Sequence, residues 1–270
     1  MKLLSDFSYG FINCFKGFTV LFEKGLWYFL FFPLIIWILL WTASIYGVFS
    51  LAEYISEWLT PYLSLDNIGN DIQWLSFIKP KLSGVFGFII RWTIKIIFWF
   101  IGSVFTKYIL LIILSPVFSL LSELADEKLT GNKFPFNIIQ LLKDVVRGTL
   151  INIRNMLLEL LLGFALWLIT FFFPPLIVIT FPLGLFVGWY FIGFSLLDYS
   201  CERHKQSVSE GVQFVRQNKG YAIGIGCVYA MFMALPTIAG DVIGIMVGPT
   251  IAVIGATLSF LEIKGRMKTS

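Results

Sequence analysis

Long apolar runs alternate along this chain with short charged segments. Residues 160–197 carry no charged side chain, and Pro174-Pro175 lies near the middle of this run. Backbone polar groups inside a bilayer must be bonded within their own segment, so a run of this kind predicts two helices that enter and return. We therefore expect a helical hairpin over 156–197 that turns at Pro174-Pro175 or near Pro182.

A second apolar run, over 220–261, predicts a second hairpin. Its middle is interrupted by Pro236, Asp241 and Pro249. The depth of both hairpins stays open, because the first arm has 14 uncharged residues before Pro174, fewer than the roughly 20 of a full span. Six full spans, or two spans with two hairpins that re-enter from one side, fit the pattern equally.

Two further long apolar segments precede the hairpins and predict transmembrane helices over 25–52 and 82–121. The first holds no charge between Lys24 and Glu53, and the second carries only a few cations. Each is long enough to cross a hydrocarbon core of about 30 Å at about 1.5 Å per residue. Ser115-Pro116 should kink or end the second helix, and Gly131 should close the helix that follows.

Residues 1–24 predict an amphipathic helix. One side carries a stripe of aromatic residues, namely Phe7, Phe11, Phe15, Phe18 and Phe22. The other side carries Asp6, Asn13, Lys16 and Glu23. The helix either lies on the cytoplasmic surface of the membrane or packs against the hairpins.

The connecting segments differ in charge. Segment 53–81 is mainly acidic, whereas segments 122–155 and 198–219 and the C-terminus are richer in Lys and Arg. The excess of positive charge on cytoplasmic loops then places 53–81 outside the cell and both termini inside. Ser207 and Glu210 form a capping box that should open a short helix. We expect one membrane domain over 1–270.

Composition supports the same class. Hydrophobic residues make up 58% of the 270 residues, charged residues 13%, and the mean hydropathy is +0.85. These values are typical of an all-α integral membrane protein, here with two long transmembrane helices, two proline-broken hairpins and an amphipathic N-terminal helix. The late start and the length of the first apolar run argue against a cleaved signal peptide. We expect no nucleic-acid partner.

Enzyme chemistry finds no support in the residues. The chain has no nucleophile–base arrangement, no phosphate-binding loop and no metal-ligand spacing, so we expect neither an enzyme nor a cofactor. Cys14, Cys201 and Cys227 are scattered and should be free thiols. His204, the one histidine, lies among charged neighbours and is expected to be solvated. Glycines 220, 224 and 226 are expected to pack helices together.

Charged residues near the apolar runs are candidates for an ion path. Lys107 lies twelve residues beyond Lys95, at mid-depth of its helix, where a lysine should face protein or water. An ion-path role and a structural role both remain open for Lys107. Asp198 and Arg203 are expected to form a helix-end ion pair. The remaining path candidates are Arg154, Glu159 and Asp241.

Several short motifs, in their order and spacing, resemble those of the CysZ sulfate transporters, whose wider group includes the etoposide-induced membrane proteins. They are Gly25-Leu26 with Pro33, Ser115-Pro116 before Glu123 and Gly131, Leu197-Asp198-Tyr199 with Arg203, Val215-Arg216, Gly224-x-Gly226, Pro236, Pro249 and Gly255-Ala256-Thr257. The resemblance implies a homo-oligomer in the lipid bilayer of the bacterial inner membrane. It also implies partly penetrating hairpins, and uptake of sulfate or a similar oxyanion for cysteine synthesis.

The resemblance also implies where an anion binds. The sulfate site of that family lies where the first long helix begins, and Lys24, Gly25 and Leu26 occupy this place here. Trp27 and Tyr28 stand where the family has arginines. Two hypotheses follow, a channel-like oxyanion permease and a membrane scaffold that transports nothing.

Overall fold

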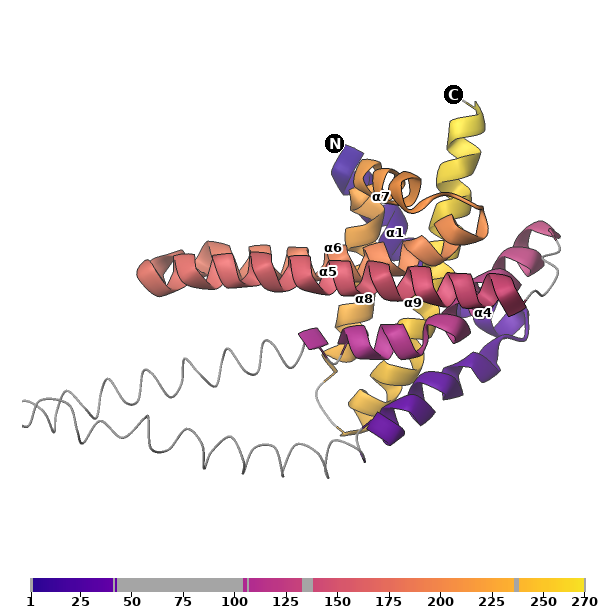
Figure 1. Ribbon diagram of the computed structural model, residues 1–270, viewed down its shortest axis with the longest axis horizontal. Coiled ribbons are helices and arrows are strands. Elements are labelled where there is room, and N and C mark those ends of the chain that lie inside the picture. Colours follow the sequence, from indigo (N-terminus) through magenta and orange to yellow (C-terminus); the bar gives the residue numbers. More distant parts are fainter. Residues whose placement is uncertain are drawn as a thin grey trace, which may run out of the picture. The chain divides into compact units, whose positions relative to one another are not determined.

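A computed structural model describes residues 2–40, 42, 104–105, 107–132, 138–235 and 238–269. Contacts between Cα atoms group residues 1–37 and 106–270 into one compact unit and residues 38–105 into another. The predicted segment 53–81 and much of the predicted helices 25–52 and 82–121 fall outside the described residues. Throughout the described part every element is a helix, which confirms the all-α class (Figure 1).

Helix α1 spans Lys2–Glu23 and ends in a left-handed turn at Gly25, whose φ is 70°. The N–H of Leu26 donates to Leu21 O at 2.8 Å and the N–H of Gly25 to Phe22 O at 3.2 Å. This pair of bonds is the Schellman arrangement. It needs a residue with positive φ at the turn, and glycine adopts this conformation without strain because it has no Cβ. The 3-10 helix η1, Trp27–Leu30, follows, and the chain bends by 118° between α1 and the helix that begins at Trp27.

The face that α1 buries is the one with small and polar residues. Helices α8, Lys219–Met233, and α9, Ile238–Thr269, cover it. Its buried members are Asp6, Gly10, Asn13, Cys14, Gly17, Val20 and Leu21. Asn13 Nδ2 donates to Ser259 Oγ at 3.2 Å and to Glu262 Oε2 at 2.8 Å. The aromatic stripe is left outward, with Phe15 and Phe22 exposed. Of the two placements that the sequence leaves open, α1 therefore adopts packing against the second hairpin.

Helix α4, Ser115–Thr130, has Pro116 in its first turn and ends at Gly131, whose φ is 76°. A short helix, Lys107–Ile113, precedes it at an angle of 65°. The break at Leu114 and the stop at Gly131 confirm the kink and the helix end predicted from Ser115-Pro116 and Gly131. The N–H of Gly131 donates to Glu127 O at 2.8 Å.

The first hairpin consists of α5, Ile138–Phe172, the 3-10 helix η3, Pro174–Leu176, and α6, Ile177–Arg203 (Figure 1). The chain turns at Pro174-Pro175, while Pro182 lies inside α6. Helix α5 has no break near residue 156, so the first arm is 35 residues long and begins earlier than the sequence predicts.

The second hairpin consists of α8, Lys219–Met233, and α9, Ile238–Thr269, with Pro249 inside α9. Helix α7, Val208–Gln217, precedes it and begins with the predicted capping box of Ser207 and Glu210. The three cysteines are free and buried, as expected.

Glycines bring the helices into close contact. A Cβ on Gly193 would overlap the backbone of Ala222, and one on Gly226 would overlap the backbone of Trp189, so α6 and α8 touch through their main chains. Gly220 and Gly224 meet α1 in the same way. This confirms the packing role predicted for Gly220, Gly224 and Gly226, and it is the kind of contact that membrane helices use.

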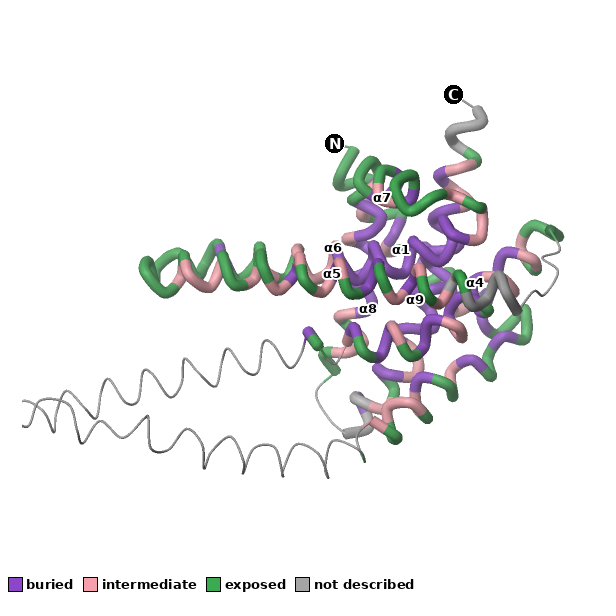
Figure 2. Tube along the Cα trace, viewed as in Figure 1, coloured by how far each residue is buried: buried purple, intermediate pink, exposed green. Residues whose placement is uncertain are grey.

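Three helices of the described part are long and apolar enough to cross a membrane, namely Val145–Phe172, Pro174–Arg203 and Val242–Gly265. The outer part of the α5–α6 hairpin is exposed, whereas residues 191–202 of α6 are buried (Figure 2). The exposed side chains there are apolar, among them Phe171, Phe172, Ile177 and Phe181. An apolar surface of this extent is unfavourable in water and favourable in lipid. The fold is that of a multi-pass membrane protein.

Candidate functional site

A row of buried polar positions follows one face of α5. Gly148, Asn152, Asn155 and Glu159 recur at intervals of three or four residues, which places them on the same side of a helix. All four are buried, and they face α6, the start of α4 and the short helix Lys107–Ile113. We call these four residues the polar seam. Buried polar groups between apolar helices are costly unless they are bonded, so the partners of the seam define the site.

One end of the seam is an ion pair. Lys107 Nζ binds Glu159 Oε1, and the hydroxyl of Tyr108 donates to Glu159 Oε2 at 2.9 Å. The exposed fraction of the side chain is 16% for Lys107 and 7% for Glu159. The ammonium also lies 5.1 Å from the ring centroid of Tyr108. Lys107 thus faces protein, as a lysine at mid-depth should.

Gly188 of α6 lies against this pair. A Cβ built on Gly188 would be 3.3 Å from Glu159 Oε1 and 3.9 Å from Lys107 Nζ. The absence of a side chain therefore lets the main chain of α6 approach both charged groups closely. A substitution at Gly188 would bring an apolar group against the carboxylate.

The ion pair lies at the middle of two candidate spans. Glu159 is 14 residues from Val145 and 13 from Phe172, so about 20 Å of helix separates it from either end. Gly188 is likewise 14 residues from Pro174 and 15 from Arg203. Charged side chains at this depth are rare and mark ion paths or relays.

The middle of the seam is only partly bonded. Asn155 Nδ2 donates to Ser195 Oγ at 2.9 Å, and Arg154 Nη1 donates to Asn155 Oδ1 at 3.0 Å. Asn152 Oδ1 is buried and has no hydrogen-bond partner among the described residues, whereas Ser115 Oγ lies within hydrogen-bonding reach of the Tyr199 hydroxyl. The polar groups of α5 therefore meet those of α4 and α6 here.

The other end of the seam carries a second ion pair. Arg147 binds both carboxylate oxygens of Asp198, at 2.9 Å and 3.3 Å, and its third nitrogen donates to the carbonyl of Gln206. Asp198 is 2% exposed, so this fork-shaped contact supplies the partners that a buried carboxylate needs.

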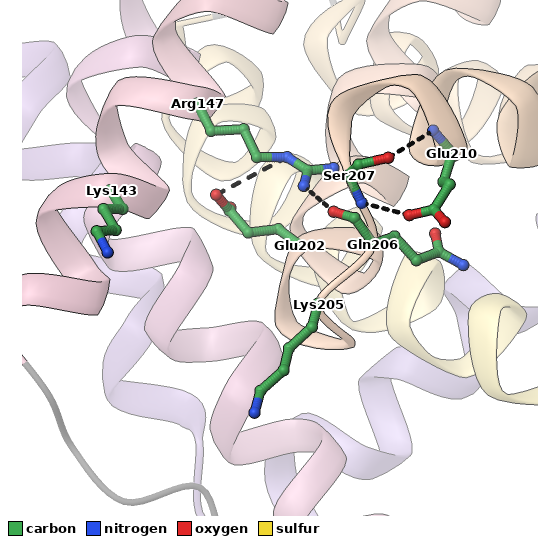
Figure 3. Close-up of a pocket in the computed structure, with 7 residues that line it drawn as sticks. All are labelled: Lys143, Arg147, Glu202, Lys205, Gln206, Ser207 and Glu210. Atoms are coloured by element: carbon green, nitrogen blue, oxygen red, sulfur yellow. Dashed lines mark hydrogen bonds and ion pairs between the residues drawn. The ribbon is translucent and has the colours of Figure 1, made fainter.

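A pocket of about 420 Å³ opens beside Arg147 (Figure 3). Its other lining residues are Lys143, Glu202, Lys205, Gln206, Ser207 and Glu210. Glu210 accepts the N–H of Ser207 in the capping box, which lowers the pKa of the Glu210 carboxyl. The pocket thus joins cations and carboxylates at the end of the seam nearest α7.

We expect Arg147→Lys to lower the free energy of unfolding by about 1.5–3 kcal/mol, because lysine keeps the charge but cannot bind both oxygens of Asp198. Thermal unfolding in detergent measures this change. Lys143→Ala, one turn earlier on α5 and exposed, is the matched control and should change stability by less than about 0.5 kcal/mol. Equal stabilities of the two variants would contradict the role given to the fork.

The structure gives Asp198 and Arg203 different partners from those predicted. Asp198 pairs with Arg147, whereas Arg203 Nη1 lies 2.9 Å from Glu123 Oε2. The predicted Asp198–Arg203 ion pair is therefore wrong, since the two residues point from α6 toward different helices. Of the remaining candidates, Lys107, Arg154 and Glu159 lie at or beside the seam, and the side chain of Asp241 is outside the described residues.

His204 is also not the solvated residue that the sequence predicts. Its Nε2 lies 2.9 Å from Asp126 Oδ2, and its ring stacks on Phe260 with centroids 4.7 Å apart. The exposed fraction of its side chain is 18%.

The predicted anion site at Lys24, Gly25 and Leu26 is a turn between helices. The N–H groups of Gly25 and Leu26 are occupied by carbonyls of α1, and Leu26 is fully buried. Lys24 is exposed. Of the groups at these three residues, the exposed ammonium of Lys24 is therefore the one that can contact an anion.

Sequence reasoning missed Tyr108, Asn152, Asn155 and Gly188. The spacing of Asn152, Asn155 and Glu159 on an apolar helix could have pointed to the seam. Tyr108 and Gly188 belong to other helices and carry no such signal. In the described part of the chain, no group of three His, Cys, Asp or Glu side chains could hold a metal ion.

Apolar helices of spanning length with a buried ion pair among them define a multi-pass, all-α membrane protein with a polar seam inside it. The chain matches the family model described as Sulfate transporter CysZ/Etoposide-induced protein 2.4 over residues 13–240. It belongs to this family.

Two curated relatives illustrate the similarity. A protein of Vibrio cholerae serotype O1 (strain ATCC 39315 / El Tor Inaba N16961), named sulfate transporter CysZ, is 27% identical over 261 residues, covering 95% of this chain and 94% of the relative. A protein of Pseudomonas fluorescens (strain Pf0-1) with the same name is 23% identical over 252 residues, covering 93% and 92%. Both are named as transporters, in agreement with the expectation that this chain is not an enzyme.

Proposed function

We propose that this protein is a channel-like permease for sulfate, working in the bacterial inner membrane and supplying sulfate for cysteine synthesis. Its family and the names of its relatives support the substrate. The observation that carries the proposal is the Lys107–Glu159 ion pair, a charged site at the middle of two apolar spans.

The polar seam is the proposed path. It extends over 12 residues of α5, from Gly148 to Glu159, or about 17 Å. Lys107 and Arg154 would offer positive charge along it, and the unbonded Oδ1 of Asn152 would leave hydrogen-bonding capacity for water or solute. Arg147 and Asp198 would form its end at the pocket, whereas Arg203 pairs with Glu123 of α4 and would lie off this path. Asp241 remains a candidate for the second hairpin.

The proposed orientation places both termini in the cytoplasm, because the basic segments follow the positive-inside rule. Lipid would cover the exposed apolar side chains of the α5–α6 hairpin, and contacts between copies of the chain in a homo-oligomer would bury part of this surface. The pocket at Arg147 would then face the cytoplasm, together with α7.

Radiolabelled sulfate uptake into liposomes that contain the purified protein tests the proposal. Unlabelled sulfate, phosphate and chloride serve as competitors, and empty liposomes as the blank. Uptake that sulfate inhibits better than chloride would support an oxyanion permease. No uptake of any anion by folded protein would contradict it and would support a scaffold of the same fold.

A role for Lys24 in recruiting the anion has its own test. We expect Lys24→Gln to lower the rate of sulfate uptake at low sulfate by at most about fivefold, because an exposed ammonium contributes about 1 kcal/mol or less. Lys16→Gln, an exposed lysine two turns earlier on α1, is the control and should leave uptake unchanged. A Lys24 variant indistinguishable from the Lys16 variant would remove this site from the path.

A further inference from the structure

The carboxylate of Glu159 occupies the position that an oxyanion would take. One of its oxygens binds the ammonium of Lys107 and the other accepts the hydroxyl of Tyr108 at 2.9 Å. An ammonium and a phenol are the donors that two oxygens of sulfate would need. The groups that hold Glu159 are thus ones that two oxygens of an oxyanion could also use.

Lys107 keeps donors for a second anion. An ammonium has three donors, and Glu159 takes one of them. On the α6 side the main chain at Gly188, and no side chain, lies against Oε1 and Nζ. No side chain of α6 at this position therefore competes for the ammonium.

We propose that Glu159 determines specificity: it competes for Lys107, and only an anion that binds Lys107 more strongly than this carboxylate does can pass. The inference rests on the proposed function. Attraction to Lys107 grows with the charge of the anion, so a dianion displaces a single carboxylate more readily than chloride does. Glu159 thereby selects divalent oxyanions over monovalent ions.

Glu159→Gln tests the proposal, because glutamine keeps the size and can still accept the Tyr108 hydroxyl but carries no charge. We expect the KM for sulfate to fall about tenfold and the preference for sulfate over chloride to fall about tenfold. Flux of both anions into liposomes measures these changes. If Glu159 only neutralises Lys107, the preference stays at the wild-type value, and that result overturns the proposal.

A second variant decides the matter where Glu159→Gln does not fold. Tyr108→Phe removes the donor that holds Oε2, so Glu159 is displaced more easily and the preference for sulfate should fall, though less than tenfold. An unchanged preference in folded Tyr108→Phe would count against the proposal. Wild-type protein without sulfate uptake would instead overturn the proposed function itself, so the two failures are distinguishable.

Gly188 supplies a matched pair of substitutions. Gly188→Ala would place a methyl group 3.3 Å from Glu159 Oε1 and crowd the ion pair, so it should lower sulfate uptake at least about tenfold. In Gly184→Ala, one turn earlier on α6, the new methyl group meets only Leu166, at 3.9 Å, and uptake should not change. Equal uptake by both variants would contradict exchange at this place.

Discussion

Lys107→Met is expected to abolish sulfate uptake and to lower the free energy of unfolding by about 3–5 kcal/mol. The loss of stability follows because Glu159 would remain buried without a counter-charge. The loss of uptake follows because the variant lacks the ammonium that faces Glu159. Denaturation in detergent and liposome flux measure the two effects on the same preparation.

The double variant Lys107→Met/Glu159→Gln separates stability from transport. Neutral side chains of similar size at both positions should restore most of the lost stability, because no charge is left unpaired. Sulfate uptake should stay absent, since the cation is still missing. A double variant that transports sulfate at the wild-type rate would show that Lys107 binds no anion on the path.

Gly193→Ala and Gly226→Ala are each expected to lower the free energy of unfolding by about 1–3 kcal/mol, with a larger loss when they are combined. Each methyl group would meet the backbone of the facing helix, so α6 and α8 would have to move apart. Unfolding in detergent measures the loss.

Gly184→Ala is the control for this contact because it lies on the same helix, where the added methyl group has room. It should raise stability by about 0.5–1 kcal/mol, since alanine favours the helical backbone more than glycine does. The expected changes in the free energy of unfolding therefore have opposite signs, negative for Gly193→Ala and Gly226→Ala and positive for Gly184→Ala. A stable Gly193→Ala/Gly226→Ala variant would mean that α6 and α8 do not meet at these glycines.

The hairpins could be predicted because lipid leaves few alternatives for a long apolar run. Two adjacent prolines remove two backbone donors, and the chain turns there. A single proline such as Pro182 or Pro249 is tolerated inside a membrane helix, so the sequence could not choose between Pro174-Pro175 and Pro182. The sequence does not predict that α5 is one continuous helix from Ile138, because the charges in its first turns are typical of a cytoplasmic segment.

The packing face of α1 could not be derived from hydrophobicity. In water, the aromatic stripe would be the face to bury. Between membrane helices, close approach favours small residues instead, and Gly10 and Gly17 contact α8 and α9 while phenylalanines face outward. Periodicity found the two faces, and the choice between them needed the neighbouring helices.

The candidate site was predictable in part. Depth along the helix singled out Lys107, because a lysine there must have a partner. Its partner, Glu159, lies 52 residues away in the sequence. The spacing of residues along one helix cannot predict a contact with a residue that far away. The same limit led to the wrong pairing of Asp198 with Arg203, which are near in sequence but face different helices.

The burial of the three thiols makes the native chain suited to chemical labelling. Cys14 and Cys201 are fully buried and Cys227 is 7% exposed, so a membrane-impermeant maleimide should leave all three unmodified. Cys14 also lies against the backbone of α9 at Gly255, where its replacement would disturb the fold. A single cysteine introduced at Pro175 would then carry the whole signal, and the side of the bilayer reached by the hairpin tip can be determined with the native cysteines left in place.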